Sequence, residues 1–224
     1  MLSLLGPCTR MGILLSALIV VFAVIGLTMH RDFYAGRRRR DFFCFYTNVS
    51  NLIVLLYFAL AAPRLYTHAQ LSPMIPHAEF AVMMSIMLTF CVFHLVLFPP
   101  IRQAARTMEH TREYWIVYTD NLIIHYIVPL SVWVYWLFCS PQKHLLGPGD
   151  ALYWTALPLL YVAYIFLRAR LAGVIQEAGS CYPYPFLDTG ALGASRVARI
   201  CTGLYGLCVI AGLCLIALVH LFAR

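Results

Sequence analysis

Two apolar segments of the chain carry polar side chains of the types that perform acyl transfer. The first segment, "FFCFYTNVSNLIVLL" (42–56), holds four of them within its first ten residues: Thr47, Asn48, Ser50 and Asn51. The second segment, "YTDNLIIHYIVPL" (118–130), includes Tyr118, Asp120, Asn121 and His125. A hydroxyl attacks an ester once a base takes its proton, and imidazole is suited to that task. Thr47 is therefore the candidate nucleophile and His125 the candidate general base.

Helical spacing sorts the polar side chains of the first segment by face. Thr47, Ser50 and Asn51 fall on one face because they are three and four residues apart. Asn48 lies about 100° from Thr47 on a helix. Asn48 and Asn51 are candidate donors to the oxyanion of a reacting ester. The alternative that stays open is that these polar residues only join helices through hydrogen bonds.

The second segment places two further side chains beside the candidate base. Tyr118 and Asn121 share a helix face with His125 and are candidates to orient its ring. Asp120 lies about 140° from His125 on a regular α-helix, so we expect it to bond with another helix instead. The alternative for His125 is a hydrogen bond to a neighbouring helix with no chemical role.

The composition around these segments is typical of a multipass membrane protein. The chain has 224 residues, of which 62% are hydrophobic and 11% are charged. Soluble domains average about 45–50% apolar and about 25% charged residues. The net charge of +7 comes from basic residues in short connections between apolar runs, so we interpret it as orientation charge and expect no nucleic-acid partner. The eight cysteines form no CxxC pair and predict no metal site.

Six apolar runs follow one another along the chain, and each approaches the ~20 residues that a helix needs to cross a bilayer. They cover residues 11–29, 42–62, 77–98, 114–138, 151–171 and 197–222. The pattern predicts an all-α integral membrane bundle of six transmembrane helices, formed as a single domain over residues 1–224.

Lysine and arginine alternate between the connections and predict an orientation. The first, third and fifth connections carry 12 of them, and the termini with the second and fourth connections carry 4. The positive-inside rule then places the odd connections in the cytoplasm and both termini outside it. Spans two and four start from odd connections, so Thr47 and His125 lie roughly 9 and 17 Å below the same membrane face.

Three segments resemble the androgen-induced, FAR-17a-like family of multipass membrane proteins and its bacterial relatives. They are "FFCFYTNVSNLIVLL", "TDNLIIHYIVPLSVWVYWLF" and "YPYPFLD" (182–188), and the similarity covers residues 11–222 in the number and order of spans. The resemblance implies a threonine hydrolase that cleaves fatty acid esters of hydroxy fatty acids. The sequence is most similar to the bacterial branch, which implies a bacterial inner membrane.

The resemblance carries over to individual residues. The threonine of "FYTN" corresponds to Thr47, and the histidine of "NLIIHYIVP" corresponds to His125. Tyr182, Tyr184 and Asp188 lie in the segment that resembles the relatives' equivalent loop, and they are candidates to support the site or bind substrate. The implied partners are a lipid ester and membrane lipids, and no metal or organic cofactor is implied.

Two functions of other classes compete with ester hydrolysis. A small transporter or a receptor-like lipid-binding protein would use the same side chains to line a polar pocket between spans two and four. A metal-dependent lipid oxidase would use His94 and His125, although the sequence has neither an HxxH nor an HxxxH pair. A covalent adduct on Thr47 would separate the hydrolase from both alternatives.

Overall fold

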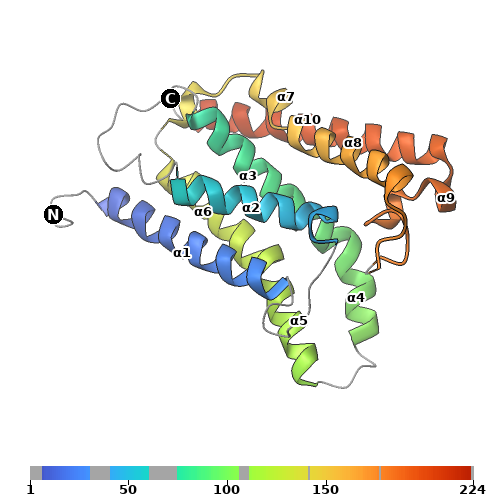
Figure 1. The fold of residues 1–224 in the computed structure, drawn as a ribbon. Helices are drawn as coiled ribbons and strands as arrows, with labels where there is room; N and C mark the ends of the chain where they lie inside the picture. The colour runs from blue at the N-terminus through green and yellow to red at the C-terminus, as the bar shows by residue number, and fades with distance from the viewer. Residues whose placement is uncertain are drawn as a thin grey trace. The chain divides into compact units, whose positions relative to one another are not determined.

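The computed structural model describes residues 7–30, 41–60, 75–105, 111–140, 142–176 and 178–222 (Figure 1). Every regular element in these ranges is helical, and the described residues add one isolated β-bridge between Ile175 and Ser180. The predicted all-α fold is therefore confirmed.

Five of the described helices are long and apolar enough to cross a membrane. They span Arg10–His30, Ile75–Gln103, Tyr114–Cys139, Asp150–Leu171 and Ala194–Phe222. Their lengths of 21 to 29 residues meet the ~20 residues that a bilayer requires. The chain is a multipass integral membrane protein.

The remaining predicted span differs from its expected bounds. Helix α2 covers Tyr46–Leu60 and has 15 residues, which is shorter than the usual minimum of about 17. The expected start at Phe42 fails because Phe42–Cys44 form a 3₁₀ turn, η2, and Phe45 is extended. Residues 61 and 62, where the span was expected to end, lie outside the described residues. The described residues therefore support five spans by length, and α2 stands apart as a shorter apolar helix.

The sequence predicts a single domain, whereas the residue contacts divide the chain into two compact units. Unit 1 comprises Met1–Arg39 and Thr47–Pro141, and unit 2 comprises Arg40–Tyr46 and Gln142–Arg224. The main elements of unit 1 are α1 (Pro7–His30), α2, α3 (Ile75–Val92), η4 (Phe93–Leu97), α4 (Phe98–Ala105), α5 (Arg112–Leu122), η5 (Ile123–Ile127) and α6 (Val128–Cys139). Those of unit 2 are η2, η6 (Lys143–Leu145), α7 (Asp150–Tyr153), α8 (Ala156–Leu171), η7 (Pro185–Leu187), α9 (Thr189–Leu192) and α10 (Ala194–Phe222).

In unit 1, α1 packs along α5, η5 and α6, and α3 packs along η5 and α6. Helix α5 begins at Arg112 because the Thr111 side chain accepts the amide N–H of Tyr114, which caps the helix. Gly26 brings α1 close to η5, since a Cβ at that position would clash with Ile124 and lie 2.9 Å from Ile123 Cγ2. This close approach places the end of α1 beside the helix that carries His125.

In unit 2, side chains from α8 and the 182–188 segment hold η2 and the residues after it. Arg168 forms an ion pair with Asp41 at 2.9 Å, and Tyr161 Oη donates to the carbonyl of Cys44 at 2.6 Å. Gly212 lets α10 lie against α7, because a Cβ there would lie 3.1 Å from the Cα of Ala151. Unit 2 is thus organised around both apolar packing and polar contacts to the main chain.

Candidate active site

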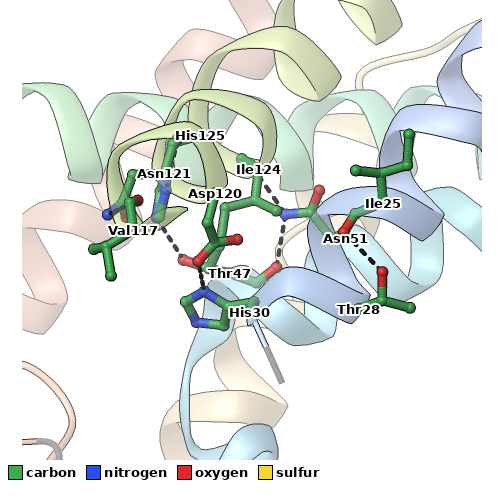
Figure 2. Close-up of polar contacts among 10 residues, drawn as sticks. All are labelled: Ile25, Thr28, His30, Thr47, Asn51, Val117, Asp120, Asn121, Ile124 and His125. Carbon is green, nitrogen blue, oxygen red and sulfur yellow. Dashed lines mark hydrogen bonds and ion pairs between the residues drawn. The ribbon is translucent and has the colours of Figure 1, made fainter. Parts of the chain in front are cut away.

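Thr47 and His125 face each other across the interior of unit 1. Thr47 Oγ1 lies 3.2 Å from His125 Nε2, and Figure 2 shows the two side chains pointing toward each other. Only 6% of Thr47 and 5% of His125 is exposed. Thr47 comes from the first turn of α2 and His125 from η5. The pair has the distance that a general base needs to take the proton of a nucleophile.

His125 lies in a π-helical segment of the span. The amide N–H of Val128 donates to the carbonyl of Ile123, five residues earlier, as in a π-helix. His125 Nδ1 lies 3.3 Å from the carbonyl oxygen of Asn121. A carbonyl oxygen only accepts, so we assign the proton to Nδ1, which leaves Nε2 free to accept from Thr47. A main-chain carbonyl therefore holds the imidazole in the tautomer that a base requires.

An aromatic ring fixes the plane of the His125 imidazole. Phe93 stacks on it with ring centroids 3.7 Å apart and planes inclined by 24°. Phe93 belongs to η4, a second π-helical segment in which the Phe98 amide donates to the Phe93 carbonyl. The His125 imidazole is therefore held by a carbonyl on one edge and by an apolar ring on one face.

Hydrogen bonds fix the turn of α2 that carries Thr47. The Thr47 carbonyl accepts from Ser50 Oγ at 3.1 Å and from Asn51 Nδ2 at 2.8 Å. Ser50 Oγ also lies 2.7 Å from Thr89 Oγ1, and its one proton is directed at the Thr47 carbonyl, so the Thr89 hydroxyl donates to Ser50. Ser50 thus supports the helix turn and joins α2 to α3.

Asn51 cannot serve as the oxyanion donor that its position in sequence suggested. Its Nδ2 donates to the carbonyl of Thr47 and, at 3.1 Å, to the carbonyl of Ile124. An amide nitrogen has two protons, and both are used by these bonds. Asn51 instead joins α2 to η5 through its bond to the Ile124 carbonyl (Figure 2). Asn48 is fully buried, and its role as an oxyanion donor stays a prediction.

Tyr118 and Asn121 do not orient the His125 ring as predicted from helical spacing. Tyr118 is 49% exposed and stacks on Tyr114 near the start of the span. Asn121 Nδ2 donates to the carbonyl of Val117 at 2.9 Å. The contribution of Asn121 is its main-chain carbonyl, which any residue would supply.

Asp120 bonds to a different helix, and its partner is a residue that the sequence analysis missed. His30 Nδ1 lies 2.6 Å from Asp120 Oδ2, and both side chains are mostly buried. The angle of about 140° between Asp120 and His125 was expected for a regular α-helix, whereas His125 lies in a π-helical segment that begins three residues after Asp120. The sequence held one signal for this partner: His30 follows the first apolar run directly, at the end that the predicted topology places on the same membrane face as Thr47.

The three candidates in the 182–188 segment lie in unit 2, where each has a structural partner. Tyr182 Oη lies 2.7 Å from Thr189 Oγ1, and Tyr184 Oη accepts the amide N–H of Tyr46 at 3.0 Å. Asp188 caps α9 by accepting the amide N–H groups of Gly190 and Ala191. The hydroxyl of Ser180 and these amides lower the pKa of Asp188. The role of Tyr182, Tyr184 and Asp188 in supporting the site or binding substrate stays a prediction.

The part of the chain that the structure describes holds no evident set of metal ligands. Within it, no three His, Cys, Asp or Glu side chains gather in a way that could hold a metal ion. His94, the other histidine of the predicted oxidase, is exposed and bonds to Tyr126 Oη at 3.0 Å.

Comparison with known proteins assigns no family or function to the chain. No family model matches the chain, and neither a curated protein nor a solved structure matches it.

Proposed function

We propose that the protein is an intramembrane threonine hydrolase that cleaves a lipid ester. The observation that carries the proposal is the buried 3.2 Å contact between Thr47 Oγ1 and His125 Nε2. Two features support it: the Asn121 carbonyl, which sets the tautomer of the base, and Phe93, which holds its ring. A buried pair with this orientation suits an acyl transfer from which bulk water is excluded.

The reaction proceeds in two steps. In the first, His125 Nε2 takes the Thr47 proton while Oγ1 attacks the ester carbonyl carbon, and His125 then gives that proton to the departing alcohol oxygen. The product is an alcohol and an acyl-threonine ester. In the second step, water attacks the acyl carbonyl carbon, His125 takes a proton from it and returns it to Thr47, and a carboxylic acid leaves. His125 thus acts as base and acid in turn.

The apolar surroundings favour a substrate with acyl chains, and the resemblance in sequence points to fatty acid esters of hydroxy fatty acids. Such a substrate would reach Thr47 from the bilayer, since α2 and η5 belong to the apolar helices of unit 1. Asn48, next to Thr47, is the candidate donor to the oxyanion. The alcohol released in the first step would then be a hydroxy fatty acid.

The proposal includes six spans in a bacterial inner membrane, with α2 as the sixth and both termini outside the cytoplasm. The asymmetry of 12 basic residues against 4 supports this orientation. A reporter that is active only in the cytoplasm should be silent when it is fused to the C-terminus. Strong reporter activity there would reverse the orientation, although Thr47 and His125 would still share one membrane face.

A fluorophosphonate probe tests the nucleophile directly. Purified protein in lipid nanodiscs should form one adduct, on Thr47, and should hydrolyse a long-chain ester. Thr47→Val, which replaces the hydroxyl with a methyl group, should lose both the adduct and the hydrolysis. Thr47→Ser should keep part of the activity because it keeps a hydroxyl.

The matched control is Thr28→Val in α1. The Thr28 hydroxyl donates to the main-chain carbonyls of Val24 and Ile25 and is not directed at a histidine (Figure 2). This variant should keep the adduct and the hydrolysis. If Thr47→Val hydrolysed the ester as fast as the parent protein, Thr47 would not be the nucleophile. Lipid binding with no adduct would favour the transporter or receptor-like alternative.

A further inference from the structure

Asp120 is a buried carboxylate that the two-step reaction leaves without a role. Only 5% of the residue is exposed. Its Oδ2 accepts from His30 Nδ1 at 2.6 Å, and its Oδ1 is buried with no hydrogen-bond partner among the described residues. Burying a carboxylate oxygen is costly unless a donor reaches it. Oδ1 is therefore available to a donor from a small molecule.

Three features place this carboxylate near the reactive pair. Asp120 precedes His125 by five residues and lies in the last turn of α5, directly before the π-helical segment that carries His125. Gly26 lets α1, whose last residue is His30, pack closely against η5, which carries His125. Figure 2 shows the Asp120–His30 and Thr47–His125 pairs in one group of polar contacts between α1, α2 and the α5–η5 helix.

Hydrolysis needs a bound water molecule, and the protons of Ser50 and Asn51 beside Thr47 are already used in hydrogen bonds to main-chain carbonyls. His125 Nε2 can accept one proton of that water, and a second acceptor would fix its orientation. A carboxylate oxygen is a strong acceptor for a water proton. Asp120 lies about 9 Å along the helix from Tyr114, near the loop end of the span where water is available.

We propose that Asp120 Oδ1 binds the hydrolytic water, and that His30 holds the carboxylate in place through Oδ2. The inference rests on the proposed threonine hydrolase. The water donates one hydrogen to Asp120 Oδ1 and the other to His125 Nε2. As its oxygen bonds to the acyl carbon, His125 takes the second proton. The bond from that carbon to Thr47 Oγ1 then breaks, and His125 returns the proton to Oγ1.

The inference predicts a defect in the second step alone. Asp120→Asn keeps one oxygen for His30 but replaces the other with an amide that donates, so the water loses its acceptor. With p-nitrophenyl decanoate, this variant should release a first stoichiometric burst of p-nitrophenol and then turn over about 100-fold more slowly. Mass spectrometry should find decanoyl-Thr47 accumulating. Hydroxylamine attacks the acyl group without the water site and should restore part of the turnover.

Two further variants keep the test informative. Asp120→Glu retains a carboxylate but moves it by one methylene, so this variant should also accumulate decanoyl-Thr47. It replaces Asp120→Asn in the test if Asp120→Asn folds poorly. Glu79→Gln is the matched control, because Glu79 is a second buried acid in unit 1 that accepts from Tyr57 Oη at 2.7 Å. Tyr57 is ten residues beyond Thr47 in α2, or about 15 Å along the helix. Glu79→Gln should keep the parental ratio of burst to steady rate.

The possible results separate the inference from the proposed function. Asp120 variants that lower the burst and the steady rate equally, or that turn over at the parental rate without an acyl intermediate, would overturn the role of Asp120. The hydrolase would then stand without it. If the parent protein itself formed no decanoyl-Thr47 and no burst, the proposed function would fail first.

Discussion

Two π-helical segments in unit 1 each carry a histidine, and the two histidines differ in burial and in hydrogen-bond partners. His94 in η4 is exposed, stacks between Phe90 and Phe98, and bonds to Tyr126 Oη. His125 in η5 is buried and lies 3.2 Å from a threonine hydroxyl on another helix. The same backbone irregularity therefore accompanies an exposed histidine among aromatic rings in one place and a buried contact between histidine and threonine in the other.

The difference shows what makes a histidine in a membrane helix a candidate base. Neither the residue type nor the π-helix is sufficient, because both segments have them. His125 adds a carbonyl that fixes Nδ1, an alcohol that faces Nε2, and burial that excludes bulk solvent. His94 has a phenol as its hydrogen-bond partner and an exposed ring. These contacts favour His125 over His94 as the base of the proposed hydrolase.

The largest effect should come from replacing His125 with alanine, and the same replacement of His94 is its control. His125→Ala should lower ester hydrolysis by about 10²- to 10⁴-fold, the usual contribution of a general base. His94→Ala should leave hydrolysis within a few-fold of the parent, because His94 does not contact Thr47. Turnover by folded protein, matched for thermal unfolding, measures both. Equal losses would show that the two segments do not differ in the way their contacts indicate.

The next largest effect should come from the position of α1 against η5. Gly26→Ala adds a Cβ that would meet Ile124 and Ile123, so α1 or η5 must shift. A displacement near 1 Å can cost about 100-fold in rate, and we expect a loss approaching that size. Gly203→Ala is the control, because a Cβ there meets nothing within 4 Å. A parental rate in both variants would mean that the site tolerates movement of α1.

A smaller effect should come from the ring that stacks on the candidate base. Phe93→Leu removes the aromatic face against His125 while keeping apolar volume, and should lower the rate about tenfold by loosening the imidazole. Phe90→Leu removes a comparable stack on His94 and should have little effect on the rate. The ratio of the two hydrolysis rates measures how much more the stack on His125 contributes to the reaction than the stack on His94. A ratio near one would contradict the role of Phe93.

The smallest effect should come from Asn121. Its side chain donates to the Val117 carbonyl, while its carbonyl accepts from His125. Asn121→Ala keeps the carbonyl, so hydrolysis and thermal unfolding should stay close to the parent, as for substitutions outside a core. A loss comparable to that of His125→Ala would show that the amide side chain has a role in the reaction.

Periodicity and residue type predicted much of the fold and the central pair of the site. Long apolar runs indicate membrane helices because hydrocarbon requires every main-chain polar group to bond within its own segment. Five of the runs correspond to helices of sufficient length. Thr47 and His125 stood out in sequence because polar side chains are costly in such runs. Helix direction then placed them at one membrane face, where the structure brings them within 3.2 Å.

The tertiary structure decided the contacts that a regular helical period cannot supply. Helical spacing assigned Tyr118 and Asn121 a role in orienting His125, but Tyr118 stacks on Tyr114 and the Asn121 side chain donates to the Val117 carbonyl. One amide proton of Asn51 is used in a bond to the Ile124 carbonyl, and this bond exists only because α2 packs beside η5.

His30 became the partner of Asp120 because α1 packs on the helix that carries it, across 90 residues of chain. A hydrogen bond between helices depends on their separation and rotation, and packing sets both. The sequence by itself therefore determined which residues are costly to bury, and the packed helices determined which of them meet.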